Sequence, residues 1–322
     1  MIPEEVFLKI VRSADKAPSG HNTQPWLFAK EEDGICIMPD YSRSLPIADS
    51  INRELFISLG CAAETAMIAA RFYGYNAQLN NDLLVNQGTI KIILSKNDAL
   101  EQPELFSYIN PRQTTRNLYG DSPISDDDLI KLKPIIKEAG IDLEFIIGQD
   151  KINKFLPYIL EANTMQMSDP CFKHELMKWL RFSEKEALLK GDGLYAACIG
   201  MPSPGKIIGN FIIEYFVTIK SEEKRLQKQL VATNMLVMFT SENNDFLSWI
   251  KTGINLQRFA LTCTQLGLSH SYVNLPCQIS QVRDKMKNDM GLTGFPQLLI
   301  RVGYSRKMHF SFRRRVNDVI LK

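Results

Sequence analysis

The stretch Leu55–Tyr75, LFISLGCAAETAMIAARFYGY, is apolar on most sides when drawn as a helix. It carries Glu64 and Arg71, and two ionisable groups favour a buried helix of a soluble protein over a membrane span. A second stretch of the same kind, WIKTGINLQRFALTCTQLGL, covers Trp249–Leu268. Both helices need an apolar partner, and we expect them to pack against each other.

The two stretches share a glycine pattern. Gly60 and Gly74 bracket the first with a spacing of 14, and Gly253 and Gly267 bracket the second with the same spacing. An apolar residue follows each closing glycine. A matching order of elements around these glycines predicts an internal repeat.

Working outward, one order of elements occurs twice, with a first helix, a strand, a long helix and a later strand in each unit. Ser125, followed by three aspartates, is typical of the N-cap that opens the second unit, and Pro134 predicts a kink in its first helix. The sequence therefore predicts an α+β fold with two antiparallel-sheet units, residues 1–108 and 109–322, the second carrying an insertion at about 150–230. The expected outer elements are a helix from Pro3 to about Ala17 and strands at 26–29, 89–95, 142–147 and 296–302.

Composition narrows the class of function. The 38 basic and 36 acidic residues leave a net charge of +2, so no overall field attracts nucleic acid or an anionic membrane. The chain opens with Pro3-Glu4-Glu5 rather than a basic segment and an apolar run, which predicts a cytoplasmic protein. Six cysteines without a CxxC pair are expected to be reduced thiols of the core.

Two other patterns lack the residues their chemistry needs. The segment Gly200–Lys206 resembles a phosphate-binding loop, but Ile207 offers no hydroxyl, and Pro202 and Pro204 offer no amide hydrogen. His174 begins a partial zinc-helix pattern in which lysine replaces the second histidine. With four scattered histidines, no metal site is predicted.

The segment from Ala17 to Trp26, APSGHNTQPW, joins the first helix to the first strand. It can be a polar connection without a ligand. Ser19, Asn22 and Gln24 also supply the short hydroxyl and amide groups that a flat heterocycle with donors and acceptors requires. Trp26 is expected in the core.

A second polar segment, Arg112-Gln113-Thr114-Thr115-Arg116, places two guanidinium groups and two hydroxyls within five residues. That set suits a phosphate monoester, and a solvated basic turn is the alternative. Near the C-terminus, Arg313-Arg314-Arg315 is either a charged tail or a further source of cation for the same phosphate.

Taken together, these segments, the glycine-bracketed helices and the ending Leu298–Tyr304 resemble the nitroreductase family of FMN proteins, in its fused two-repeat, Acg-like branch. The resemblance covers nearly the whole chain outside the insertion. It implies one FMN held between the two units, with transient NAD(P)H as donor and small nitroaromatic, quinone or similar acceptors. The flavin would carry the chemistry, so no catalytic protein side chain is implied. A monomer is possible because the family's dimer interface would be intramolecular.

The family's two binding motifs are divided between the units. The first unit has Pro18, Ser19 and Asn22, whereas residues 138–140 read Glu-Ala-Gly where the second unit would carry that motif. The second unit has the 112–116 motif. One complete composite site and one lost site follow from the resemblance. It also places the segment Tyr272–Pro276 along the flavin edge, with Asn274 as the side chain nearest the ring, and Arg313 near the phosphate.

A different class of function stays open. The segment Gly191–Asn210, with five glycines and two prolines, can form a lid over the ring. If that lid stayed closed, the protein would bind or store FMN with little turnover.

Overall fold

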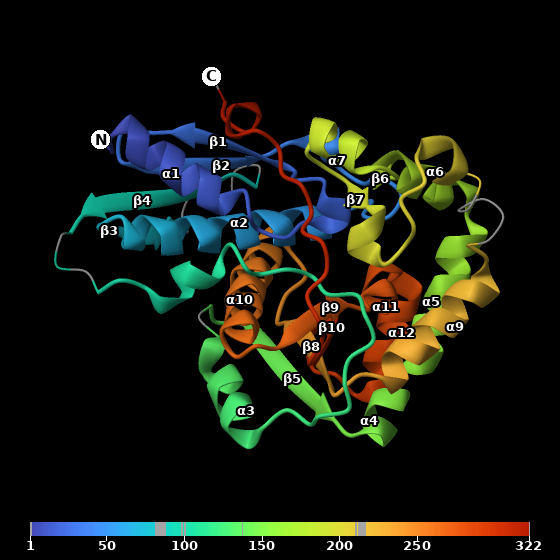
Figure 1. Ribbon diagram of the computed structural model, residues 1–322. Coiled ribbons are helices and arrows are strands. Elements are labelled where there is room, and N and C mark those ends of the chain that lie inside the picture. Colours follow the sequence, from blue (N-terminus) through green and yellow to red (C-terminus); the bar gives the residue numbers. More distant parts are fainter. Residues whose placement is uncertain are drawn as a thin grey trace.

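Two four-stranded antiparallel sheets with one strand order lie on either side of two long helices (Figure 1). The computed structural model describes residues 2–80, 88–97, 99, 101–136, 138–209, 211 and 217–321. In each sheet the strands lie in the order first, second, fourth, third along the chain. The strands of the first sheet are β1 (Trp26–Lys30), β2 (Gly34–Pro39), β3 (Tyr75–Leu79) and β4 (Ile90–Lys96). Those of the second are β5 (Ile141–Ile147), β8 (Met235–Ser241), β9 (Ser269–Tyr272) and β10 (Phe295–Gly303).

The helices repeat this order. The long helix α2 (Arg53–Phe72) joins the second strand to the third in the first sheet, and α10 (Phe246–Gln265) does so in the second. The first helix of each half, α1 (Glu4–Ala14) or α3 (Asp126–Leu132), packs on the long helix of its own half. The α+β fold class is thus confirmed.

Helices α2 and α10 cross at two glycines. A Cβ atom at Gly60 would lie 2.1 Å from the Ile250 carbonyl oxygen, and one at Gly253 would lie 2.0 Å from that of Ile57. Each glycine therefore faces the carbonyl three residues before the other, and the backbones touch without side chains between them. The same interface holds an ion pair between Glu64 and Arg258.

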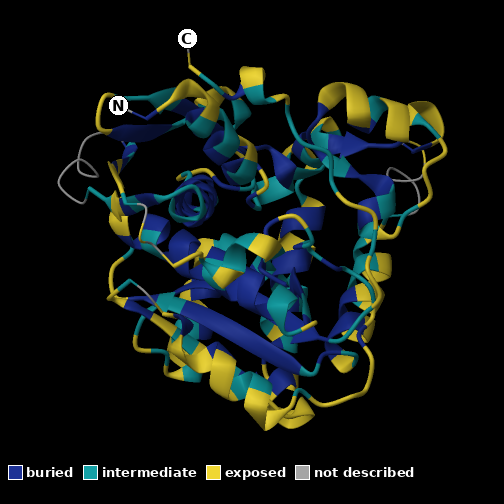
Figure 2. Ribbon diagram, turned by 60° about the vertical axis from the view of Figure 1, so that its left-hand side comes forward, coloured by how far each residue is buried: buried dark blue, intermediate teal, exposed yellow. Residues whose placement is uncertain are grey.

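Helix α2 lies inside the protein, although its length and composition would suit a membrane span. The helix is long and apolar enough to cross a membrane, but 89% of its most apolar window is buried inside the protein. Figure 2 shows buried residues throughout the interior and exposed ones mainly on the outer helices and loops.

The second half differs from the first by its connections. Where β1 and β2 are joined by a short turn, β5 and β8 are separated by a helical layer, and two helices separate β9 from β10 (Figure 1). The first connection holds α4 (Gln149–Asn153), α5 (Leu156–Ser168), α6 (Pro170–Trp179), β6 (Leu180–Arg181), α7 (Glu184–Lys190), β7 (Leu194–Tyr195) and α9 (Ile219–Val231). The second holds α11 (Leu275–Gln278) and α12 (Ser280–Met290). Short 3-10 helices lie at Gly20–Asn22, Tyr41–Arg43, Glu104–Tyr108, Lys133–Ile135, Ala196–Ile199 and Val316–Asp318.

Two extended segments cross from one half to the other. The C-terminal tail runs along β1, where the Phe28 N–H donates to the Val319 carbonyl at 2.7 Å and the Leu321 N–H donates to the Phe28 carbonyl at 2.8 Å. The segment after the first sheet runs along β9, where the Thr115 N–H donates to the His270 carbonyl at 2.9 Å. Both crossings bring polar residues to the interface between the sheets.

The structure corrects several details of the sequence analysis. Tyr75 begins β3 instead of ending the long helix, because Gly74 adopts a left-handed φ of 82° that stops α2. Cys171 is an exposed thiol near the start of α6, so only the other five cysteines belong to the interior. Strands β2, β3, β8 and β9 were not predicted. Ser125 does cap α3, accepting from the Asp128 N–H at 3.1 Å, and the helix gives way to a 3-10 turn at Pro134.

We predict that Gly60→Ala destabilises the protein by about 1–3 kcal/mol, although alanine is the better helix former by ~1 kcal/mol. The added methyl group would push the two helix backbones apart. Gly120→Ala is the control, since its nearest neighbour would be 3.8 Å away, and it should change the stability by less than about 0.5 kcal/mol. Urea unfolding of both variants measures this, and a Gly60→Ala protein as stable as the parent would contradict the crossing.

Candidate functional site

A cavity of about 390 Å³ lies beside the crossing of α2 and α10, within the size range of small-molecule sites. Its walls come from the loop after α1, the first two turns of α2, the 109–116 segment, the start of α11 and the C-terminal tail. The cavity is therefore built from both halves of the chain. Its polar lining includes Lys16, Ser19, His21, Asn22, Glu54, Ser58, Asn110, Arg112, Gln113, Thr114, Arg116, Tyr272, Asn274, Gln278, His309, Ser311 and Arg313.

The loop after α1 has an unusual backbone. His21, Asn22 and Gln24 have φ values of 46°, 55° and 53°, in the left-handed region that costs a non-glycine residue of order 1–3 kcal/mol. Hydrogen bonds hold the strained turn, because the Asn22 amide donates to the carbonyls of Gly193 at 3.0 Å and Phe312 at 3.1 Å. The loop is thus tied to the insertion and to the C-terminal tail.

Gln24 does not line the cavity, although the sequence suggested it as a cofactor contact. It is fully buried, and its amide donates to the Gly191 carbonyl at 2.9 Å and accepts from the Arg314 N–H at 2.8 Å. Those bonds leave no polar atom facing the cavity. Gln24 positions the loop and the tail that form the wall.

One end of the cavity is strongly cationic. Arg112 and Arg313 both donate to the Lys16 carbonyl, at 2.5 Å and 3.1 Å, so their guanidinium groups lie side by side. Arg116 comes from the same segment as Arg112 and donates to the Cys198 carbonyl at 3.4 Å. Asp15 lies behind Arg313 and does not line the cavity.

The guanidinium groups at this end bond only to uncharged acceptors among the described residues, and some of their donors have no acceptor. Arg112 Nε, Arg313 Nε and the Tyr272 hydroxyl are buried without a hydrogen bond among the described residues. Burial lowers the pKa of Arg112 and, helped by repulsion from Arg112, lowers that of Arg313 to about 10. Buried donors without acceptors, and positive charges without a carboxylate partner, indicate a site for an anion.

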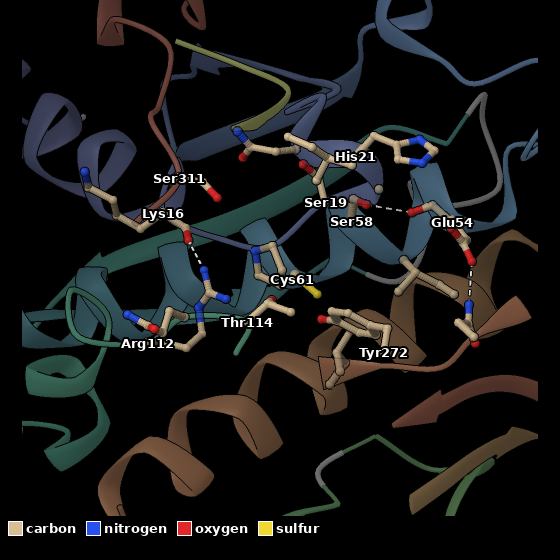
Figure 3. A pocket seen from close by; sticks show the side chains of 18 of the residues that line it. Lys16, Ser19, His21, Glu54, Ser58, Cys61, Arg112, Thr114, Tyr272 and Ser311 are labelled. Carbon is tan, nitrogen blue, oxygen red and sulfur yellow. Dashed lines mark hydrogen bonds between the residues drawn. The ribbon is translucent and has the colours of Figure 1, made fainter. Parts of the chain in front are cut away.

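The opposite end holds the only carboxylate among the described lining residues, that of Glu54 (Figure 3). It accepts from the Asn274 amide and from the Gln278 amide at 3.0 and 3.1 Å, and Arg53 lies 3.3 Å away. Burial raises the pKa of Glu54, against the influence of Arg53. The two ends therefore differ in charge, with Lys16 and Arg112 on one side of Figure 3 and Glu54 on the other.

Side chains of mixed polarity line the space between the ends. Ile57, Ser58 and Cys61 follow one face of α2, and Leu256 and Leu298 come from the second half. Burial raises the pKa of the Cys61 thiol, so this cysteine is a neutral group whose Sγ donates to the Gly253 carbonyl at 3.2 Å. The middle of the cavity thus suits a flat, largely uncharged ligand.

The structure brings most of the sequence candidates together. Of the nine, only Gln24 lies outside the lining; the other eight are Pro18, Ser19, Asn22, Arg112, Thr114, Arg116, Asn274 and Arg313. The amides of Asn22 and Asn274 are both engaged by protein partners, since Asn274 Oδ1 also accepts from the Leu299 N–H at 3.0 Å. They shape the wall more than they face the cavity.

Sequence reasoning missed Glu54, Gln278 and the tail residues His309 to Ser311, all of which line the cavity. Glu54 lies in the first turn of the long helix α2, where an acid is expected for its interaction with the helix dipole alone. The tail and Gln278 reach the cavity only through the crossings between the two halves. No local pattern in the sequence marks them.

No protein-family model matches the chain. It is similar to the "Putative NAD(P)H nitroreductase Rv3131" of Mycobacterium tuberculosis, with 22% identity over 94% of this chain and 86% of that protein. It is also similar to the "Probable NAD(P)H nitroreductase PigM" of a Serratia species, with 20% identity over 99% of this chain and 93% of that protein. A solved nitroreductase with bound FMN from Bacteroides fragilis aligns with 66% of this chain and 94% of its own, with 13% identity and a TM-score of 0.39. The two relatives confirm the resemblance to nitroreductases.

We predict that His270, beside the cationic end, makes the stability depend on pH. Burial, with repulsion from Arg112 and Arg116, holds its pKa at about 3 in the folded chain, against about 6.5 for an exposed imidazole. Between these two pKa values only the unfolded chain binds the proton. The free energy of unfolding should therefore decrease as the pH drops below 6.5, by up to ~1.4 kcal/mol per pH unit.

His270→Gln should remove this part of the pH dependence. Urea unfolding of the parent and the variant at pH 7.5, 6.5, 5.5 and 4.5 measures the difference between them. If the two curves ran parallel across this range, the imidazole would not be held neutral in the fold.

Proposed function

We propose that the chain is an FMN-dependent oxidoreductase that uses NAD(P)H to reduce nitroaromatic, quinone or similar small acceptors. The observation that carries the proposal is the cavity between the two halves, where one buried and two half-buried guanidinium groups, those of Arg112, Arg116 and Arg313, have no carboxylate beside them among the described lining residues. A ligand with one terminal phosphate and a flat ring system fits this cavity. The names of the two relatives support the same class of reaction.

Arg112, Arg116 and Arg313 would hold the FMN phosphate, with the Thr114 hydroxyl as a further donor. The free Nε atoms of Arg112 and Arg313 fit this role, because an oxyanion supplies the acceptors they lack. The cavity offers no glycine-rich loop at a helix N-terminus of the kind that binds a dinucleotide pyrophosphate, which favours FMN over FAD.

The ring would lie between the Pro18–Asn22 loop and the start of α11, where Ser19 and Asn274 line the cavity. We propose that residues 1–108 and 109–322 are the two units of a fused pseudo-dimer, with the insertion at about 150–230 in the second. The shared strand order and the paired glycines support this division. Because each binding segment occurs in one unit only, one chain would bind one FMN. A cytoplasmic monomer is consistent with this arrangement.

When bound, FMN supplies the hydride-transfer chemistry, and no protein side chain need form a covalent bond with substrate. The chain's own contribution is to neutralise the phosphate, to fix the strained loop and to exclude water from the buried cavity. Glu54 accepts hydrogen bonds from the Asn274 and Gln278 amides, and these bonds fix the three side chains at the end of the cavity where the ring would lie.

One observation supports the alternative of a flavin-binding protein with little turnover. The segment that begins at Gly191 is fastened to the strained loop, since the Gly193 N–H donates to the Asn22 carbonyl at 3.2 Å and the Gln24 amide donates to Gly191. Leu194 of this segment lines the cavity. If those bonds never opened, the ring would be covered.

We predict that the purified protein is yellow and releases one FMN per chain on heating. Anaerobic NADH or NADPH should bleach the flavin band if the chain is an oxidoreductase. A stably bound flavin that only dithionite reduces would favour the storage function. A colourless protein that ignores added FMN, or one that holds two flavins per chain, would overturn the assignment of the cavity.

We predict that Arg112→Ala weakens FMN binding by about 1.5–3 kcal/mol, the scale of a lost charge-assisted hydrogen bond, and leaves the fold intact. Glu138→Ala, at the position of the missing second motif, is the control and should leave the affinity nearly unchanged. Flavin fluorescence titration measures both. Equal losses would contradict a single site with its phosphate at Arg112.

A further inference from the structure

A second cavity, of about 320 Å³, lies next to the Glu54 end of the first, called the ring end because the flavin ring would lie there. It is formed by the loop before α2, the start of α6 and the junction of α11 with α12. Glu175 fixes the loop, because its carboxylate accepts from the backbone N–H groups of Ile47 at 3.0 Å and Ala48 at 2.9 Å. These two bonds hold the loop before α2 as one wall of the cavity.

Arg283 lines this cavity without a partner. Its side chain is on a residue only 8% exposed, its Nε is a buried donor without an acceptor, and no described residue bonds to its guanidinium group. The neighbouring acid Asp284 is exposed on the helix surface and makes no ion pair with it. An anion bound in this cavity would give the Nε atom an acceptor and the guanidinium group a counterion.

The helix that carries Arg283 also presents its N-terminus to the cavity. Helix α12 has 11 residues, and its N-cap residue, Ile279, offers no side-chain acceptor. Ser280, the first residue of the helix, lines the cavity one turn before Arg283. Ser280, at the start of a helix without a side-chain cap, and Arg283 thus line one space, and the start of a helix favours an anion.

Two acids, Asp49 and Asp169, also line the cavity, and neither forms an ion pair with Arg283. Asp169 accepts from the Cys171 N–H at 2.8 Å, and Asp49 accepts from the Leu55 N–H at 2.9 Å, so each caps a helix of its own. Arg53 adds a further positive charge, although its own donors are bonded to Gln297, Cys277 and Glu54.

Gln278 connects the two cavities, because it lines both of them. Its amide donates to Glu54 at the ring end, and its oxygen accepts from the Gln166 amide at 2.8 Å on the other side. A ligand in the second cavity therefore lies across one side chain from the ring end of the first.

We propose that the second cavity is an anion site, formed by Arg283, Ser280 and the N-terminus of α12, that binds a phosphate group of the nicotinamide dinucleotide donor. The identity of the donor rests on the proposed function. The phosphate chemistry itself rests on the unpartnered cation and the uncapped helix. The site for the FMN phosphate is separate, at the opposite end of the first cavity.

The test uses FMN-loaded protein and two probes, inorganic pyrophosphate in a calorimetric titration and NADH or NADPH in anaerobic stopped-flow reduction of the flavin. Arg283→Gln should weaken both pyrophosphate and donor binding by about tenfold or more, with the limiting rate of flavin reduction and the FMN affinity unchanged. Lys285→Gln removes one charge from the exposed face of the same helix, where Lys285 pairs with Glu161, and should change neither binding constant.

Ser280→Asp is a second variant that tests the site without loss of stability. An acid in the first turn of a helix stabilises the helix, so this variant should unfold at the same temperature or higher and still bind the donor at least tenfold more weakly by repelling its phosphate. Added pyrophosphate should compete with the donor in the parent protein and not in Arg283→Gln.

Each outcome is decisive. Parent protein that does not bind pyrophosphate, or an Arg283→Gln variant that binds it equally well, overturns the anion site. Pyrophosphate binding lost in Arg283→Gln with donor binding unchanged overturns the donor assignment. An Arg283→Gln variant with weaker FMN binding would show that the flavin phosphate occupies this site instead. Flavin that dithionite reduces and NAD(P)H does not would refute the proposed donor, and the pyrophosphate titration would still decide the anion site.

Discussion

The close approach of α2 and α10 at Gly60 and Gly253 is the constraint on which the rest of the structure depends. With carbonyl oxygens 2.0–2.1 Å from where a Cβ atom would stand, only hydrogen fits at either position. The two helices then bury their apolar faces against each other and against one sheet each. The cavity lies beside this crossing, lined by Ile57, Ser58 and Cys61 of α2 and by Leu256 of α10.

The two halves share a strand order but contribute different segments to the cavity. The 109–116 segment and the C-terminal tail bring Arg112, Arg116 and Arg313 to a single cavity, although Arg313 is about two hundred residues from the others in the sequence. Their charges repel one another, and the pKa of Arg313 falls to about 10 as a result of burial and of this repulsion. Such an arrangement costs folding free energy unless an anion is bound, so the stability of this region and ligand binding are coupled.

The insertion contributes walls to both cavities. Leu194 lines the first, and Gln166 and Asp169 line the second. Hydrogen bonds from Asn22 and Gln24 fasten the insertion to the strained loop, whose left-handed residues would relax without them. The contacts that fasten the insertion are thus the same contacts that hold the loop in its left-handed conformation.

The sequence by itself predicted the α+β class and the two long buried helices, because these depend on local periodicity and capping. Short polar motifs, together with the resemblance to nitroreductases, pointed to eight of the residues that line the cavity. The spacing of Gly60 and Gly74 and its repetition at Gly253 and Gly267 also marked the helices that pair. Only the tertiary structure decided that Gln24 lies behind the wall of the first cavity and that Glu54 and Gln278 line the end of it opposite the arginines. It also decided that Arg283 Nε has no hydrogen-bond acceptor among the described residues. Whether a buried polar group is satisfied depends on residues distant in the chain, and a single sequence shows the group without its neighbours.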